Sequence, residues 1–172
     1  MIRRMWTGAV LSACLIAGCG YTQQVTLPHN IKTLNIPTFE NKIPPTERYA
    51  YQPGLEIELT NAVIDRFIFD GNLKVTDESQ ADAVLKGAII SYEQEGVRFD
   101  DLESPDEYRL FLVVSFKLLD RKTGEVILAE PNFSGHTEFF NSRSPAVTRR
   151  TAANNVVVDL ARSLVDRIVE EW

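Results

Sequence analysis

The chain has 172 residues, 44% of them hydrophobic, and a formal net charge of −6. This length suffices for one domain with a sizeable core, and the acidic balance argues against a nucleic-acid partner, because phosphate binding rests on lysine and arginine. The two histidines and two cysteines lack the paired spacing typical of metal ligands, which argues against a metalloenzyme.

The N-terminus is typical of an export signal. Two arginines precede an apolar run over residues 5–17, which is shorter than the roughly 20 residues of a membrane-spanning helix and matches a signal peptide. The run ends in Leu15-Ile16-Ala17-Gly18-Cys19, which resembles the lipobox of bacterial lipoproteins. This resemblance implies that residues 1–18 are removed and that Cys19 becomes the first residue, with a diacylglycerol on its sulfur and an acyl chain on its nitrogen.

Two alternatives stay open at this point. Leu11-Ser12-Ala13-Cys14 also fits a lipobox but leaves only residues 5–11 as the apolar segment, and an ordinary secretory signal could precede an incidental cysteine. With Cys19 acylated, the mature chain has 154 residues, a net charge of −8 and no cysteine for a disulfide. Two or more acyl chains anchor a protein stably, and Gly20, by resemblance to enterobacterial lipoproteins, favours the outer membrane, with the domain facing the periplasm.

The mature chain is expected to begin with a tether over residues 19–30 and a strand. Residues 31–36 alternate apolar and polar side chains, which predicts a half-buried strand, and the proline-containing stretch 39–53 predicts a loop. Residues 54–70 predict a helix, because their apolar residues fall on one stripe, and Gly71 follows as a left-handed cap. The stripe consists of Leu55, Leu59, Ala62, Val63 and Phe67.

The middle of the chain predicts most of a sheet. An acidic connection at residues 96–106 matches no calcium-binding loop and predicts a solvated loop, and residues 120–124 are typical of a hairpin turn. Strands are expected over residues 73–76, 83–93, 108–119, 125–128 and 133–140. The strongest pattern is that of residues 108–119, in which every second residue is apolar and forms one continuous face. These residues are Leu110, Leu112, Val114, Phe116 and Leu118.

The last helix is expected from Ser144 almost to Trp172, with Pro145 at its first position. Its buried stripe is expected to contain Ala153, Val157, Leu160, Leu164 and Ile168. The order of elements predicts an α+β fold for residues 31–172: a two-layer sandwich with two helices on one face of a small mixed sheet of about four strands.

Catalytic chemistry is not expected. The chain has no phosphate-binding glycine motif and no pattern for a cofactor or metal site. His136 shares a predicted strand face with Ser134 and Glu138, but same-face neighbours on a strand lie nearly 7 Å apart, too far for the nucleophile–base contact of about 3 Å. We therefore interpret His136 as a structural or interface residue.

Contact residues are predicted instead on the second face of the central strand and among the arginines and lysines. Phe111 and Val113 give that second face a partly apolar character, suited to a partner or a lipid. Arginine binds phosphate through paired hydrogen bonds, so the basic groups could touch a phosphorylated glycolipid, although solvated surface charge is the simpler interpretation. The basic groups are Arg121 and Lys122 on the hairpin, and Arg143, Arg149 and Arg150 at the start of the last helix.

Several short motifs follow one another along nearly the whole mature chain. The motifs are Cys19-Gly20-Tyr21, Leu27-Pro28, Ile36-Pro37-Thr38-Phe39-Glu40-Asn41, Pro53-Gly54-Leu55-Glu56-Ile57-Glu58-Leu59-Thr60-Asn61-Ala62, Asp70-Gly71 and Ala81-Asp82-Ala83-Val84-Leu85-Lys86-Gly87. In this order they resemble the lipopolysaccharide-assembly lipoprotein family, LptE. The resemblance implies that the chain sits inside an LptD-like outer-membrane β-barrel that delivers lipopolysaccharide to the cell surface, helps this barrel to assemble and plugs it; direct lipopolysaccharide binding is left open.

Other classes fit parts of this pattern. The motif over residues 35–41 also resembles lipoproteins that activate peptidoglycan synthases or form curli-type secretion pores, but a pore would need further strands of about 10 residues. A periplasm-facing lipid carrier would need an apolar cavity.

Overall fold

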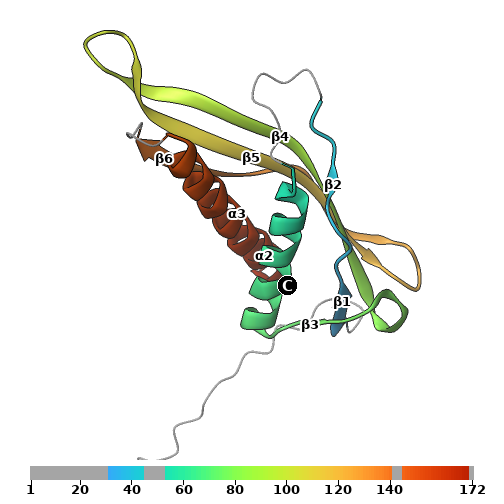
Figure 1. The fold of residues 1–172 in the computed structure, drawn as a ribbon. Coiled ribbons are helices and arrows are strands. Elements are labelled where there is room, and N and C mark those ends of the chain that lie inside the picture. Colours follow the sequence, from blue (N-terminus) through green and yellow to red (C-terminus); the bar gives the residue numbers. More distant parts are fainter. Residues whose placement is uncertain (1–30, 45–52, 141–144, 171–172) are drawn as a thin grey trace, which may run out of the picture.

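The structure, a computed structural model, describes residues 31–44, 53–140 and 145–170; for residues 145–147 it describes the backbone alone. Cys19, the tether and Arg143 lie outside the described residues. The elements are β1 (Thr33–Asn35), β2 (Glu40–Asn41), α2 (Leu55–Asp70), β3 (Lys74–Val75), the 3-10 helix η3 (Glu78–Gln80), β4 (Ala83–Phe99), β5 (Pro105–Asp120), β6 (Val126–Phe140) and α3 (Pro145–Glu170). Both helices lie on the same side of the sheet (Figure 1).

The sheet is mixed, with the order β3-β1-β4-β5-β6 and with β2 paired to the first half of β4. The pairs β1–β3, β1–β4 and β2–β4 are parallel, whereas β4–β5 and β5–β6 are antiparallel. The predicted α+β architecture is confirmed, but the sheet has six strands where about four were expected. The short strand expected over residues 73–76 is β3. Strand β2 was not expected, because it has only two residues, too few to show a period in the sequence, and it lies in the stretch 39–53 that was expected to be a loop.

The long strands extend further than their sequence patterns suggested. Residues 96–106 are not one loop as expected, because β4 runs to Phe99 and β5 begins at Pro105. Asp100 closes the remaining turn, since its Oδ1 accepts the N–H groups of Leu102 and Ser104, each at 2.9 Å. The two strands expected at 125–128 and 133–140 are one strand, β6, which passes Pro131 through a register shift.

Helix α2 follows the predicted stripe. Gly54 and Gly71 flank it in left-handed conformations with φ of 97° and 78°, and the N–H of Gly71 donates to the carbonyl of Phe67 at 3.0 Å. Glycine adopts this conformation without the strain that a side chain would cause. Gly71 therefore ends the helix just after the last residue of the stripe, Phe67. Of that stripe, Ala62 is half-buried and the other four residues are buried.

The core lies between the helices and one face of β4 and β5. The alternating apolar residues of β5 are all at most 1% exposed, and so is most of the predicted stripe of α3, with Ala153, Leu160, Leu164 and Ile168 at 1% or less. Helix α3 packs closely on β6, because a Cβ at Gly135 would lie 3.1 Å from the Cβ of Leu160. This packing commits one face of the sheet to the helices and leaves the other face open.

Candidate functional site: the open face of the sheet

The open face is the side of β4, β5 and β6 turned away from the helices. Successive side chains of a strand point to opposite sides, so the burial of Leu110 and Leu112 places Phe111 and Val113 on the open face. Phe111 pairs with Glu93 and His136 across the sheet, and Val113 pairs with Ser91 and Ser134. The described helices leave this face uncovered (Figure 1).

Phe111 and Val113, the predicted contact residues, are neighbours on this face and are half-buried. The ring of Phe111 lies 5.9 Å from that of His136, centroid to centroid, and the guanidinium of Arg109 lies 6.0 Å from the same ring. Arg109 also donates to Glu138 through Nε and an Nη at 3.0 and 2.6 Å. This part of the open face is therefore a polar surface with a partly apolar centre, which is typical of a non-obligate protein interface.

In the sequence His136 shares a strand face with Ser134 and Glu138. In the structure the side chains of His136 and Glu138 contact different residues. Glu138 accepts from Arg109, and that hydrogen bond raises the pKa of the Arg109 guanidinium, while His136 packs on Phe111. In the described part of the chain no hydrogen bond joins His136 to Ser134 or Glu138. The arrangement therefore matches no nucleophile–base pair, and no group of three potential metal ligands occurs among the described residues.

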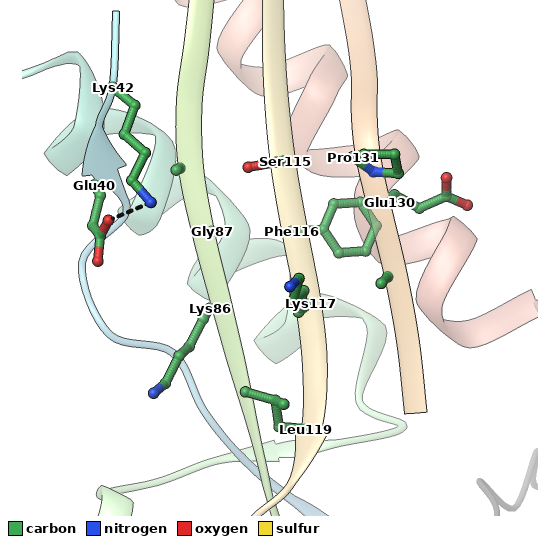
Figure 2. Close-up of a pocket in the computed structure, with 12 residues that line it drawn as sticks. Glu40, Lys42, Lys86, Gly87, Ser115, Phe116, Lys117, Leu119, Glu130 and Pro131 are labelled. Carbon is green, nitrogen blue, oxygen red and sulfur yellow. Dashed lines mark ion pairs between the residues drawn. The ribbon is translucent and has the colours of Figure 1, made fainter. Parts of the chain in front are cut away.

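A trough of about 460 Å³ continues the open face toward the other end of β5 (Figure 2). Its charged residues are Glu40, Lys42, Lys86, Lys117 and Glu130, and its small and apolar residues include Ala88, Leu119, Ala129 and Pro131. No motif in the sequence predicts this trough. The alternation of strand 83–93 puts Lys86 on the open face, but only the strand register brings it beside Lys117.

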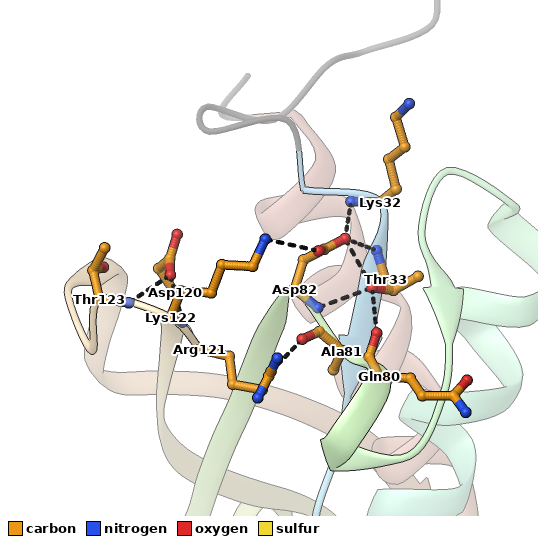
Figure 3. Close-up of polar contacts among 9 residues, drawn as sticks. All are labelled: Lys32, Thr33, Gln80, Ala81, Asp82, Asp120, Arg121, Lys122 and Thr123. Atoms are coloured by element: carbon orange, nitrogen blue, oxygen red, sulfur yellow. Dashed lines mark hydrogen bonds and ion pairs between the residues drawn. The ribbon is translucent and has the colours of Figure 1, made fainter.

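The hairpin residues Arg121 and Lys122 contact the end of the sheet (Figure 3). The Nε of Arg121 donates to the carbonyl of Ala81 at 2.5 Å, and the Nζ of Lys122 lies 4.0 Å from the Oδ1 of Asp82. Arg149 and Arg150 are exposed at the start of α3, which follows the opposite end of β6. The structure therefore brings Phe111 and Val113 together but keeps the two described basic groups at opposite ends of the sheet.

Asp82 joins the start of β1 to the start of β4 (Figure 3). Its Oδ2 accepts the Oγ1–H of Thr33 at 2.8 Å and the N–H groups of Lys32 and Thr33, each at 3.1 Å. The N–H of Asp82 donates in return to the Oγ1 of Thr33 at 2.9 Å. The hydrogen bond from Thr33, followed by that from Lys32, lowers the pKa of Asp82.

Asp82→Ala is expected to lower the free energy of unfolding at neutral pH by about 1 kcal/mol. The two backbone N–H groups and the Thr33 hydroxyl lose a charged acceptor, but the effect stays small because water can still reach them. A lowered pKa in the folded state means that the carboxylate stabilises the fold at neutral pH and stops doing so as the pH falls through that pKa. In urea unfolding, the difference in the free energy of unfolding between the variant and the unsubstituted protein should therefore shrink below about pH 4. Asp77→Ala is the control, since Asp77 makes no side-chain cap; a difference for Asp82→Ala that persists in acid would contradict this account.

Comparison with protein families shows to which family the chain belongs. The family model LptE, described as lipopolysaccharide-assembly, matches residues 31–170. The chain belongs to the LptE family. The match covers every strand and helix of the described fold, and it supports a role in lipopolysaccharide assembly in the broad sense.

Solved structures show the same fold as this LptE-family chain at low sequence identity. A protein from Xanthomonas campestris is 16% identical with a TM-score of 0.60, covering 81% of this chain and 83% of its own. A minor lipoprotein from Acinetobacter baumannii is 15% identical with a TM-score of 0.54, covering 82% and 94%. A hypothetical protein from Chlamydia trachomatis is 12% identical with a TM-score of 0.54, covering 81% and 96%. A search of curated proteins finds no match.

These structural similarities establish the fold alone, so the role in lipopolysaccharide assembly rests on the family match. Neither described helix, α2 or α3, is both long and apolar enough to span a membrane.

Proposed function

We propose that this chain is an outer-membrane lipoprotein that assembles with, and plugs, an LptD-like β-barrel translocon delivering lipopolysaccharide to the cell surface. The observation that carries the proposal is the match of the LptE family model to residues 31–170. The lipid anchor expected on Cys19 holds the domain at the membrane, which raises its effective concentration next to a membrane-embedded partner.

The half of the open face around Phe111 and Val113 is the surface that meets the barrel. A plug needs one rigid layer and one surface available to its partner. Here α2 and α3 occupy one side of the sheet, whereas the other side presents half-buried apolar side chains among charged ones. A rim of polar groups around an apolar centre excludes water from the contact while keeping the free protein soluble enough to fold.

Depletion of the chain from cells is expected to reduce lipopolysaccharide at the cell surface and to retain newly made lipopolysaccharide inside, because the barrel loses the subunit that assembles and plugs it. Surface labelling of lipopolysaccharide in intact cells, compared with the total in lysed cells, measures this. Unchanged surface labelling after complete depletion would contradict the proposed function.

Expression of variants in the depleted cells distinguishes between the two candidate lipidation sites, Cys14 and Cys19. Cys14→Ser should restore surface lipopolysaccharide, since Cys14 leaves with the signal peptide. Cys19→Ser should leave the chain out of the outer-membrane fraction, because the anchor then has no thiol to carry the diacylglycerol. The opposite result would assign the anchor to Cys14.

A further inference from the structure

The outer edge of β6 has no pairing partner in the described part of the chain. The sheet order ends with β6, which pairs with β5 on one side. In an antiparallel pair, every second residue points its N–H and C=O groups away from the neighbouring strand. Half of the backbone groups of β6 therefore face outward along this edge, and such a row of donors and acceptors is a template for another strand.

The two halves of β6 differ in how well this edge is protected. Natural sheets protect their edges with prolines, bulges and lysines. The first half of β6 carries Pro131 and the register shifts of the strand. Residues 133–140, in contrast, pair with β5 without interruption and contain neither proline nor lysine. The second half is therefore the part of the edge that can accept a strand.

A groove of about 440 Å³ lies beside this unprotected half, between β6 and α3. Val158 is 64% exposed and gives the groove an apolar wall, while Asp159 pairs with Arg162, so neither charge of that pair is left unmatched. A groove between an edge strand and a helix suits an extended peptide, which adds to the strand while its alternate side chains enter the groove. The groove is lined by His136 and Thr137 of β6 and by Asn155, Val158, Asp159 and Arg162 of α3.

We propose that an extended segment of the barrel partner adds to residues 133–140 of β6 as a further strand, with alternate side chains in the groove against α3. Main-chain hydrogen bonds along the edge supply affinity, and Val158 selects an apolar side chain among those that face the helix. The closed wall of a barrel has no free edge of its own, so the segment belongs to a part of the partner outside that wall. The proposal rests on the proposed function and deepens it by naming how the partner is held.

The position of α3 favours a single added strand over a second copy of this chain. Helix α3 packs directly on β6, where a Cβ at Gly135 would lie 3.1 Å from the Cβ of Leu160. Two copies paired edge to edge would bring their β6 strands about 4.8 Å apart. Packed helices need about 8–10 Å between their axes, so the two α3 helices would collide. A lone strand brings no helix and avoids this collision.

The unprotected edge is continuous with the surface that we assign to the barrel. Ser134 and His136 lie in this half of β6 and are the direct cross-strand neighbours of Val113 and Phe111. A strand added to β6 would therefore extend the open face from these residues outward. One partner can occupy both surfaces at once, which points to the barrel as the source of the segment.

Hydrogen exchange tests the added strand at the level of single amides. The full acylated chain is measured alone and in the complex purified with its barrel, in the same detergent, by mass spectrometry at residue resolution. In the chain alone, every second amide of residues 133–140 should exchange quickly, because it faces the free edge. In the complex these amides should exchange at least roughly tenfold more slowly. The alternate amides, which already bond to β5, should change little.

Two neighbouring asparagines of α3 provide a matched pair of variants. Asn155 and Asn154 are both exposed, but Asn155 lines the groove beside β6 whereas Asn154 lines the groove between α2 and α3. Asn155→Trp fills the space that the added strand needs, so it should reduce the co-purified barrel by roughly tenfold or more. Asn154→Trp should retain the barrel, and both variants should unfold at nearly the temperature of the unsubstituted protein.

The outcomes separate this inference from the proposed function. Unchanged exchange along the edge although the barrel co-purifies would overturn the added strand and leave the proposed function standing. Full retention of the barrel by Asn155→Trp, or equal loss by both variants, would overturn the groove as its site. Absence of the barrel from the unsubstituted chain would overturn the proposed function and this inference with it.

Discussion

Phe39→Ala is expected to lower the free energy of unfolding by about 3–5 kcal/mol, the range for truncating a buried aromatic side chain. Phe39 is 1% exposed and its N–H donates to the Oγ1 of Thr60 at 3.0 Å, so it joins the segment before β2 to helix α2. Its ring also occupies the space where a side chain at Gly87 would lie: a Cβ there would meet the ring at 2.1 Å. Urea unfolding measures the loss, and Phe140→Ala, at a 54% exposed phenylalanine, should cost far less.

The contact between the ring and Gly87 makes the two positions interdependent. Gly87→Ala alone should destabilise by about 1–3 kcal/mol, because its methyl group overpacks a filled space. In the Phe39→Ala background the same methyl enters the vacated space, so most of that penalty should disappear. A double-mutant cycle measures the coupling; additive effects would show that the ring does not lie against Gly87. Either variant also tests the β2–β4 contact that forms the Glu40 and Lys42 side of the trough.

Val113→Asp is expected to reduce the amount of co-purified barrel by roughly tenfold or more, because an unpaired carboxylate would be taken out of water at the centre of the contact. Val113 lies between Ser91 and Ser134 on the open face, so no lysine or arginine sits directly opposite to neutralise it. The measurement is the ratio of barrel to tagged chain after purification from detergent-solubilised membranes.

Ile68→Asp provides the matched control for this experiment. Ile68 is 64% exposed on α2, one of the two helices on the other side of the sheet (Figure 1). It should retain the barrel, and both variants should unfold at nearly the temperature of the unsubstituted protein. Equal retention by Val113→Asp would place the contact elsewhere, and equal loss by Ile68→Asp would mean that the helix layer also meets the partner.

The helices and the central strand could be predicted because their signals are local. The 3.6-residue stripe of α2 and α3, the glycine that ends α2, and the alternation of β5 each lie within one continuous segment. Helical and strand periods are visible at those lengths. The same alternation placed Phe111 and Val113 on the face opposite the core, where the structure has them.

Features that depend on pairing between distant segments could not be predicted. The two-residue strand β2 exists only through its parallel partner β4, and the like-charge pair of Lys86 and Lys117 appears only once the β4–β5 register is known. Arg121 gave the same sequence signal as a free surface arginine, but its Nε donates to a carbonyl 40 residues away in the chain. Contacts between segments that are distant in the chain leave no periodic pattern in either segment.

The central claim is that this LptE-family lipoprotein works as a subunit of an outer-membrane translocon. It is tested most directly by purifying the tagged, acylated chain from detergent-solubilised membranes and quantifying what accompanies it. A large outer-membrane β-barrel is expected in an amount equal to the chain. A periplasmic peptidoglycan synthase in its place, or no barrel at all, would contradict the claim.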